Sequence, residues 1–194
     1  MSNIIPAARP KLSRKEALKL IKEAYPDFKL PDFFILGIRG YYLDTMGEAG
    51  KNDRNIYDDA IFLIGKEDCI AFNGNTDPAA FRKAIAVLKP GIWPAYQFAL
   101  HKSQYMALCQ RGASVTVVRD GTGTDTGMFG INIHRGGNWG TSSLGCQTIP
   151  PPQWDEFITT AMGMAKKYYD KAYRSKSDYT YVLLEYKKPE PAIE

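Results

Sequence analysis

The segment Ile131-Asn-Ile-His134-Arg-Gly-Gly-Asn-Trp-Gly-Thr-Ser-Ser143-Leu-Gly145-Cys146-Gln-Thr-Ile149 carries the densest structural signal in this 194-residue chain. β-Branched residues before His134 predict a strand. The Gly, Ser and Thr residues after it predict a loop that folds back on that strand. The loop ends in Ser-x-Gly-Cys, where a glycine lets the backbone approach the thiol closely. The chain has only two histidines and three cysteines, so this pairing indicates chemistry.

A thiol that attacks a carbonyl needs a base, a positioned thiolate and backbone N–H groups for the oxyanion. His134 and Cys146 are placed to supply the base and the nucleophile. The other common fate of a free cysteine is that of a small buried apolar residue. Cys69, inside an apolar strand, and Cys109, beside Leu108, fit that description, whereas Cys146 follows a Gly/Ser/Thr loop that would present it.

His134, the glycine-rich loop and Ser143-Leu-Gly-Cys146 resemble the active-site motif of the L,D-transpeptidase (YkuD-type) catalytic domain. The resemblance implies that Cys146 is the nucleophile and that His134 is its general base. It also implies that Ser143 and Gly145 shape the loop, and that backbone N–H groups around Gly145 and Cys146 form the oxyanion hole. The wider pattern over residues 125–150 looks like the bacteriophage lytic-enzyme, endolysin-like branch of this family.

Two features depart from the family pattern. The loop before Cys146 is shorter than in the transpeptidases, and Gln147-Thr148 follows it where a hydrophobic residue and Arg or Asn are expected. We therefore expect Arg135 or Gln147 to supply the missing substrate contact. The other candidate substrate-binding residues are Thr141, His101, Arg39 and Tyr42.

Alternatives remain open for several of these residues. His101 ends an apolar stretch and is a core hydrogen-bonding group, a cleft residue or a second base. Arg39 and Tyr42 follow a buried strand and either bind a peptide or pack in ordinary turns. A zinc site from His101, His134 and Cys146 can be drawn, but no short-range ligand pair anchors it. We expect no metal and no cofactor.

The element pattern predicts one α+β domain with a β-rich, mixed-sheet core and N-terminal and C-terminal helices. Ser13-Arg-Lys-Glu16 has the form of a capping box, which predicts a helix over residues 14–25. Apolar residues at helical spacing predict a long helix over 154–173, and a short helix is predicted over 79–87. The predicted strands are 33–38, 61–64, 69–72, 95–101, 115–119, 129–134 and 179–186.

The chain shows no linker or repeat that would divide it. We expect a flexible lead at residues 1–12, where Pro6 and Pro10 block regular structure. The L,D-transpeptidase-like catalytic domain is predicted at 13–188, with a sheet core of that family's type, and a tail at 189–194.

A formal net charge of +4 suits contact with an anionic polymer such as cell wall, and equally an ordinary, weakly basic surface. No basic run with interleaved aromatic residues indicates nucleic-acid binding. The N-terminus lacks the features of a signal peptide, and no segment approaches the roughly 18 continuous apolar residues of a membrane span. We expect a monomer made in the host cytoplasm that reaches the periplasm or cell wall by release or injection.

With the resemblance, these features predict a cysteine peptidase that cleaves peptidoglycan stem peptides or cross-links. One alternative is an L,D-transpeptidase that forms cross-links or exchanges D-amino acids, because the same acyl-enzyme passes either to water or to an amine. The other is a non-catalytic wall-binding or virion domain in which Cys146 is inert.

Overall fold

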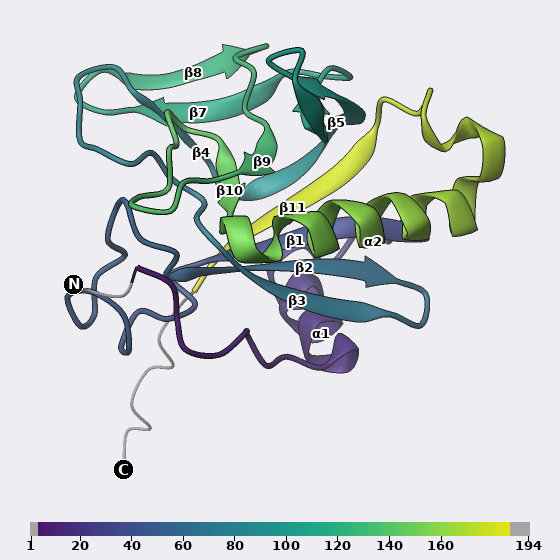
Figure 1. The fold of residues 1–194 in the computed structure, drawn as a ribbon, viewed down its shortest axis with the longest axis horizontal. Coiled ribbons are helices and arrows are strands. Elements are labelled where there is room, and N and C mark those ends of the chain that lie inside the picture. The colour runs from purple at the N-terminus through teal and green to yellow at the C-terminus, as the bar shows by residue number, and fades with distance from the viewer. Residues whose placement is uncertain (1–3, 187–194) are drawn as a thin grey trace.

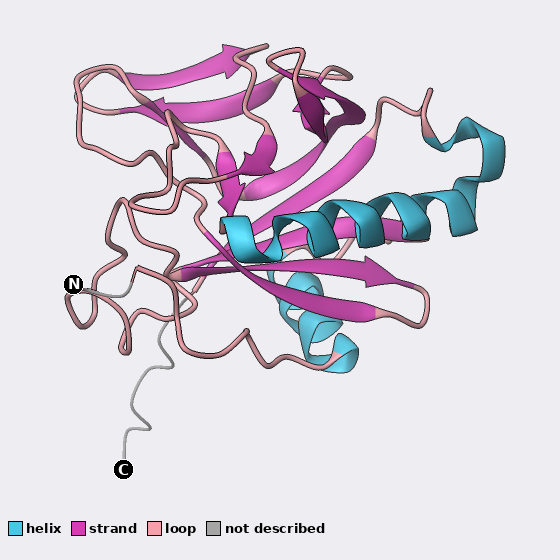
Figure 2. Cartoon of the chain, viewed as in Figure 1, coloured by secondary structure: helices cyan, strands magenta, loops and turns pink. Residues whose placement is uncertain are grey.

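The computed structural model describes residues 4–186, and its core is one large sheet with helices packed around it (Figures 1 and 2). In spatial order the strands of this sheet are β10 (Gln147–Ile149), β9 (Ile133–Arg135), β6 (Tyr105–Gln110), β5 (Gly91–His101), β11 (Tyr179–Glu185), β1 (Phe33–Arg39), β2 (Asp59–Gly65) and β3 (Cys69–Gly74). The predicted α+β domain with a mixed-sheet core is confirmed. The predicted tail at 189–194 lies outside the described residues.

The eight-stranded sheet is mixed and nearly closes on itself. β1 and β11 run parallel, as do β9 and β10, while the other neighbouring pairs are antiparallel. The two edges of the sheet meet where Asn75, just after β3, exchanges backbone hydrogen bonds of 2.9 and 2.8 Å with Thr148 of β10. This closure brings the turn after β3 beside the strand that follows Cys146.

The two α-helices cover opposite faces of the central strands (Figure 1). α2 (Pro151–Tyr169) packs over the face that carries Phe33 and Ile35, and α1 (Arg14–Ala24) packs over the face that carries Phe34 and Leu36. Every residue of β1 and β2 is therefore buried. Neither helix in the described part of the chain has the length and hydropathy of a transmembrane span.

The helix boundaries follow local capping rules. The predicted capping box is present, with Glu16 N–H donating to Ser13 Oγ and Ser13 N–H donating to the Glu16 carboxylate. α2 begins at Pro151, three residues before the predicted start, because proline needs no N–H partner in a first helical turn. It ends at Tyr169, and the 3₁₀-helix η1 (Asp170–Tyr173) follows.

The smaller sheet has the order β4 (Ala86–Leu88), β7 (Val115–Arg119) and β8 (Gly123–Gly127). The predicted helix over 79–87 is wrong, since residues 79–85 form a loop and β4 pairs with β7. Two backbone N–H groups there donate to distant acceptors instead of to a preceding helical turn. Ala79 donates to Ser143 O at 2.9 Å, and Ala84 donates to Asp120 O at 2.8 Å.

The strand predicted over 129–134 is shorter in the structure, because β9 begins only at Ile133. The N–H groups of Phe129 and Ile131 donate to Gln110 Oε1 at 3.1 and 3.0 Å. The Gln110 side-chain amide thus accepts the hydrogen bonds that a neighbouring strand would otherwise accept. Besides β4, three strands were not predicted from the sequence: β6, β8 and β10.

Residues 4–12 have no regular structure but are held against the rest of the chain. Ile4 O accepts from Tyr57 N–H at 2.8 Å, and Ala8 O accepts from the Tyr42 hydroxyl at 2.7 Å. Arg9 forms an ion pair with Glu156 of α2. The segment therefore links the β3 region to α2.

Candidate active site

His134 and Cys146 lie on neighbouring segments of the sheet. Thr148 lies opposite His134 in the β9–β10 pair. Gln147 N–H donates to Asn132 O at 2.8 Å, which places Cys146 just before the paired region. The structure thereby brings the backbone segments of the two motif residues together. In residues 4–186 no hydrogen bond joins their side chains.

The Cys146 thiol is half-buried and sits between two backbone groups. Its Sγ accepts from Asn132 N–H, and the thiol donates to Gly130 O, each at 3.4 Å. Burial raises the pKa of Cys146, and the Asn132 N–H only partly opposes this. The sequence motif predicts a thiolate, which needs a lowered pKa. In the structure the resting group is a neutral thiol.

His134 is buried and oriented by a backbone carbonyl. Its Nδ1 lies 2.8 Å from Arg135 O. A carbonyl oxygen only accepts, so Nδ1 carries the proton and the unprotonated lone pair is on Nε2. Burial lowers the pKa of His134 to about 4, and the neighbouring His101 and Lys102 act in the same direction. The ring is therefore neutral near pH 7, and its low pKa makes it a weak base in the resting protein.

His101, at the end of β5, stacks on His134 with ring centroids 4.3 Å apart and planes 17° from parallel. Asn132 fixes the protonation of this second ring. Asn132 Oδ1 accepts from Gln110 N–H at 2.9 Å, which turns its Nδ2 toward His101 Nδ1 at 3.2 Å. His101 Nδ1 is therefore the acceptor, and its proton is on Nε2. The two stacked rings have opposite tautomers.

Asn132 is a site residue that sequence reasoning missed. Its backbone N–H reaches the Cys146 sulfur, and its side chain reaches His101. The available signal was its position two residues before His134, which puts both side chains on one face of an extended segment. Tyr105 was also missed, and its ring lies 5.5 Å from that of His101 and 5.8 Å from that of Trp154.

Ser143 and Gly145 shape the turn before Cys146, as the resemblance implies. Ser143 Oγ donates to Cys146 O at 2.7 Å and accepts from Gly145 N–H at 3.0 Å. Gly145 has φ +122°, and a Cβ there would overlap the Ala86 carbonyl oxygen. Its N–H is already bonded, so it is not a free oxyanion donor. Within residues 4–186, no protein group accepts from Cys146 N–H, which leaves that group for an oxyanion.

The candidate substrate-binding residues differ in accessibility. Arg135 is exposed, with its guanidinium 5.1 Å from the centre of the Tyr105 ring. Gln147 and Thr141 are fully buried. The Gln147 amide bonds to Gly145 O and to the Tyr181 hydroxyl. Arg135 is thus the one of these three that faces solvent.

Arg39 and Tyr42 lie in a different hydrogen-bonded region. The buried Arg39 donates to Thr76 Oγ1 at 3.0 Å and to Leu88 O at 3.0 Å. The Tyr42 hydroxyl donates to Ala8 O and accepts from the Asn73 amide. Both side chains hold segments of the protein together, which favours the packing role over peptide binding.

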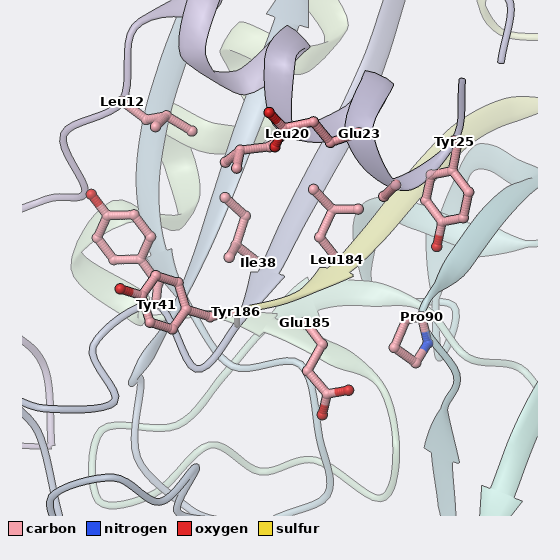
Figure 3. Close-up of a pocket in the computed structure, with 11 residues that line it drawn as sticks. Leu12, Leu20, Glu23, Tyr25, Ile38, Tyr41, Pro90, Leu184, Glu185 and Tyr186 are labelled. Atoms are coloured by element: carbon pink, nitrogen blue, oxygen red, sulfur yellow. The ribbon is translucent and has the colours of Figure 1, made fainter. Parts of the chain in front are cut away.

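Neither a metal-binding group in the described residues nor the pocket on the α1 side of the sheet coincides with this site. In the described part of the chain, no three His, Cys, Asp or Glu side chains are placed to hold a metal ion together. A pocket of about 700 Å³ lies on the α1 side of the sheet, lined by Leu20 and Ile38 with the Glu23 and Glu185 carboxylates at its edge (Figure 3). No candidate catalytic residue lines it.

No protein-family model, curated protein or solved structure matches this chain. The site is therefore interpreted from its own geometry.

Proposed function

We propose that the protein is a cysteine peptidase that cleaves peptidoglycan stem peptides or cross-links, with Cys146 as nucleophile and His134 as general base. The observation that carries this proposal is the position of His134 in β9 beside the segment that follows Cys146, with the Nδ1 of His134 committed to Arg135 O. Nε2 is therefore the unprotonated nitrogen of the imidazole.

The resting pair is neutral, so proton transfer accompanies nucleophilic attack. His134 Nε2 takes the thiol proton as Cys146 Sγ bonds to the peptide carbonyl carbon, and the carbonyl oxygen becomes an oxyanion near Cys146 N–H. The tetrahedral species collapses, the C–N bond breaks, and His134 returns the proton to the departing amine. Water, deprotonated by the same histidine, then hydrolyses the thioester and regenerates the thiol.

The choice of a peptidoglycan substrate rests on the sequence motif and on one exposed cation. Ser143-Leu-Gly-Cys146 after a strand histidine resembles the L,D-transpeptidase motif and its endolysin-like branch. Arg135, next to His134 and exposed, is suited to bind a stem-peptide carboxylate. The proposal includes a core of the transpeptidase type, and a protein that acts in the periplasm or wall after release or injection.

Digestion of purified wall fragments, followed by mass spectrometry of the products, tests the proposal. The wild-type protein should give shortened or separated stem peptides, and Cys146→Ala should lose activity by several orders of magnitude. Cys109→Ala is the matched control, because Cys109 is buried and donates only to Ala99 O. If Cys146→Ala formed products at the wild-type rate, a mechanism with Cys146 as nucleophile would be ruled out.

The same experiment with added D-amino acid distinguishes hydrolysis from transfer. Water at roughly 55 M outcompetes millimolar amines unless an acceptor site holds an amine in place. We expect mainly hydrolysis products. Spectra dominated by new cross-links or D-amino-acid adducts would assign the L,D-transpeptidase alternative.

A further inference from the structure

A second polar cluster lies away from Cys146 and has no role in the proposed mechanism. It contains four buried side-chain oxygens that no protein donor reaches: Asn52 Oδ1, Asp58 Oδ1, Asn75 Oδ1 and Asp77 Oδ1. Asp58 and Asn75 are fully buried, and Asp77 is 4% exposed. A buried polar oxygen without a partner destabilises a fold, and four in one region require a common explanation.

Hydrogen bonds join three of the four residues, and Asp58 lies within electrostatic reach of Asp77. Asn52 Nδ2 donates to Asp77 Oδ2 at 2.9 Å, and Asn75 Nδ2 donates to Asp77 O at 2.7 Å. Asp58 and Asp77 interact electrostatically, and Asp58 Oδ2 accepts from the N–H of Asp53, next to Asn52, at 2.8 Å. In each case one atom of the side chain is fixed by the protein and the other oxygen is left over.

The cluster also holds more carboxyl groups than the cations beside it can balance. Burial and the nearby Asp59 raise the pKa of Asp58 and of Asp77 to about 8. Arg39 and Arg54 oppose this at Asp77. However, the hydrogen bonds of Arg39 go to Thr76 and Leu88, and Arg54 forms its ion pair with Asp120. The crowded carboxyls and the unmatched acceptors both point to a positively charged partner.

We propose that Asp58, Asp77, Asn52 and Asn75 form a cation site that takes Ca²⁺ through two carboxylate and two amide oxygens. Ca²⁺ accepts carboxylate, amide and backbone carbonyl oxygens in flexible geometry and completes its shell with water. Amide oxygens supply half of this set, which agrees with the finding that no three acidic, His or Cys side chains in residues 4–186 could hold a metal by themselves.

The site would join the loops that surround the catalytic turn. Asn75 exchanges backbone hydrogen bonds with Thr148, two residues after Cys146. Tyr57, next to Asp58, donates from its hydroxyl to Gly137 O at 2.7 Å in the His134–Cys146 loop. A bound cation would therefore fix both supports of that loop. The inference does not depend on the proposed peptidase function.

Thermal unfolding of the full chain, first treated with chelator and then titrated with CaCl₂, tests the proposal. We expect Ca²⁺ at about 100-fold above its Kd to raise the Tm by roughly 5–10 °C. Calorimetric titration should give one Ca²⁺ per chain. Mg²⁺ should act more weakly, because it demands regular octahedral geometry. No change in Tm with CaCl₂ would overturn the proposal.

Asp77→Asn removes one proposed ligand charge while keeping the shape of the side chain. We expect this variant to lose the Ca²⁺ response and to have an unchanged or higher Tm in chelator, because carboxylate repulsion is reduced. Asp125→Asn in the exposed β8 strand is the control and should keep the response. An equal Ca²⁺ shift in Asp77→Asn would place the ion elsewhere. A Tm that rises at lower pH and ignores Ca²⁺ would assign the oxygens to protonated carboxyls. Either result would contradict the site.

Discussion

At the catalytic pair the groups that set the proton positions find partners within the protein, whereas around Asp77 four buried carboxyl and amide oxygens do not. Among the described residues near Cys146, the buried hydroxyls of Thr141 and Thr148 also have no hydrogen-bond partner. Asn132 and Arg135 O fix the tautomers of both histidines, and Ser143 closes the turn before the thiol. At Asp77 and Asn75, by contrast, one atom is bonded and the second acceptor is left over.

The difference separates two ways of using buried polarity. A catalytic pair must have one defined arrangement before substrate arrives, which requires the groups that set its proton positions to be satisfied by the chain itself. A ligand site keeps acceptors unmatched because their partner comes from solution. The catalytic arrangement can be tested through its base, His134, through its thiol, Cys146, and through the glycine turn at Gly145.

The largest effect is expected from His134→Gln. The variant keeps a polar side chain but loses the proton acceptor, so kcat/KM for wall fragments should fall by roughly 10²- to 10⁴-fold. His101→Gln alters the stacked partner and leaves the base, so its loss should be much smaller. Equal losses in steady-state kinetics of the two variants would indicate that the stack as a whole, and not His134 alone, is required.

The second prediction concerns the reactivity of Cys146 toward iodoacetamide. Burial raises the pKa of its thiol above the ordinary value of 9.0, so the reactive thiolate is scarce at neutral pH and accumulates only in alkaline solution. The alkylation rate, followed by peptide mapping, should rise about tenfold per pH unit from pH 7 to 9. A rate that is already maximal at pH 7 would show a stable thiolate–imidazolium pair instead.

Gly145→Ala should lower the free energy of unfolding by roughly 2–4 kcal/mol, because it combines a positive φ with a close backbone contact. The added Cβ would meet Ala86 O. Gly163→Ala in α2 has open space around its Cβ and should stabilise the protein by about 0.5–1 kcal/mol. Urea unfolding measures both. A Gly145→Ala variant as stable as wild type would mean that the turn is not rigid.

The sequence predicted the elements whose causes are local. The capping box at Ser13 marks the start of α1 without any distant contact. The strand predicted over 115–119 has the same two ends as β7. His134 and Cys146 were identified because the loop between them is short. Their positions on neighbouring segments then follow from the pairing of β9 with β10.

The rest depends on partners that are distant in sequence. The helix predicted over 79–87 fails because its N–H groups donate to Ser143 and Asp120. β8 is a polar strand, Gly-Thr-Asp-Thr-Gly, that exists through its pairing with β7. The raised pKa of Cys146 and the Asn75–Thr148 closure arise only when the sheet curls, and no local pattern contains that information.

The central claim, that Cys146 is the nucleophile, is tested most directly by trapping its acyl-enzyme. Protein mixed with stem peptide and quenched in acid should gain the mass of the acyl fragment, because a thioester persists at low pH. Tryptic mapping should place that mass on the peptide 136–166, which contains Cys146 and no other cysteine. Cleavage of the substrate with no adduct, or an adduct on a peptide containing Cys69 or Cys109, would contradict the account.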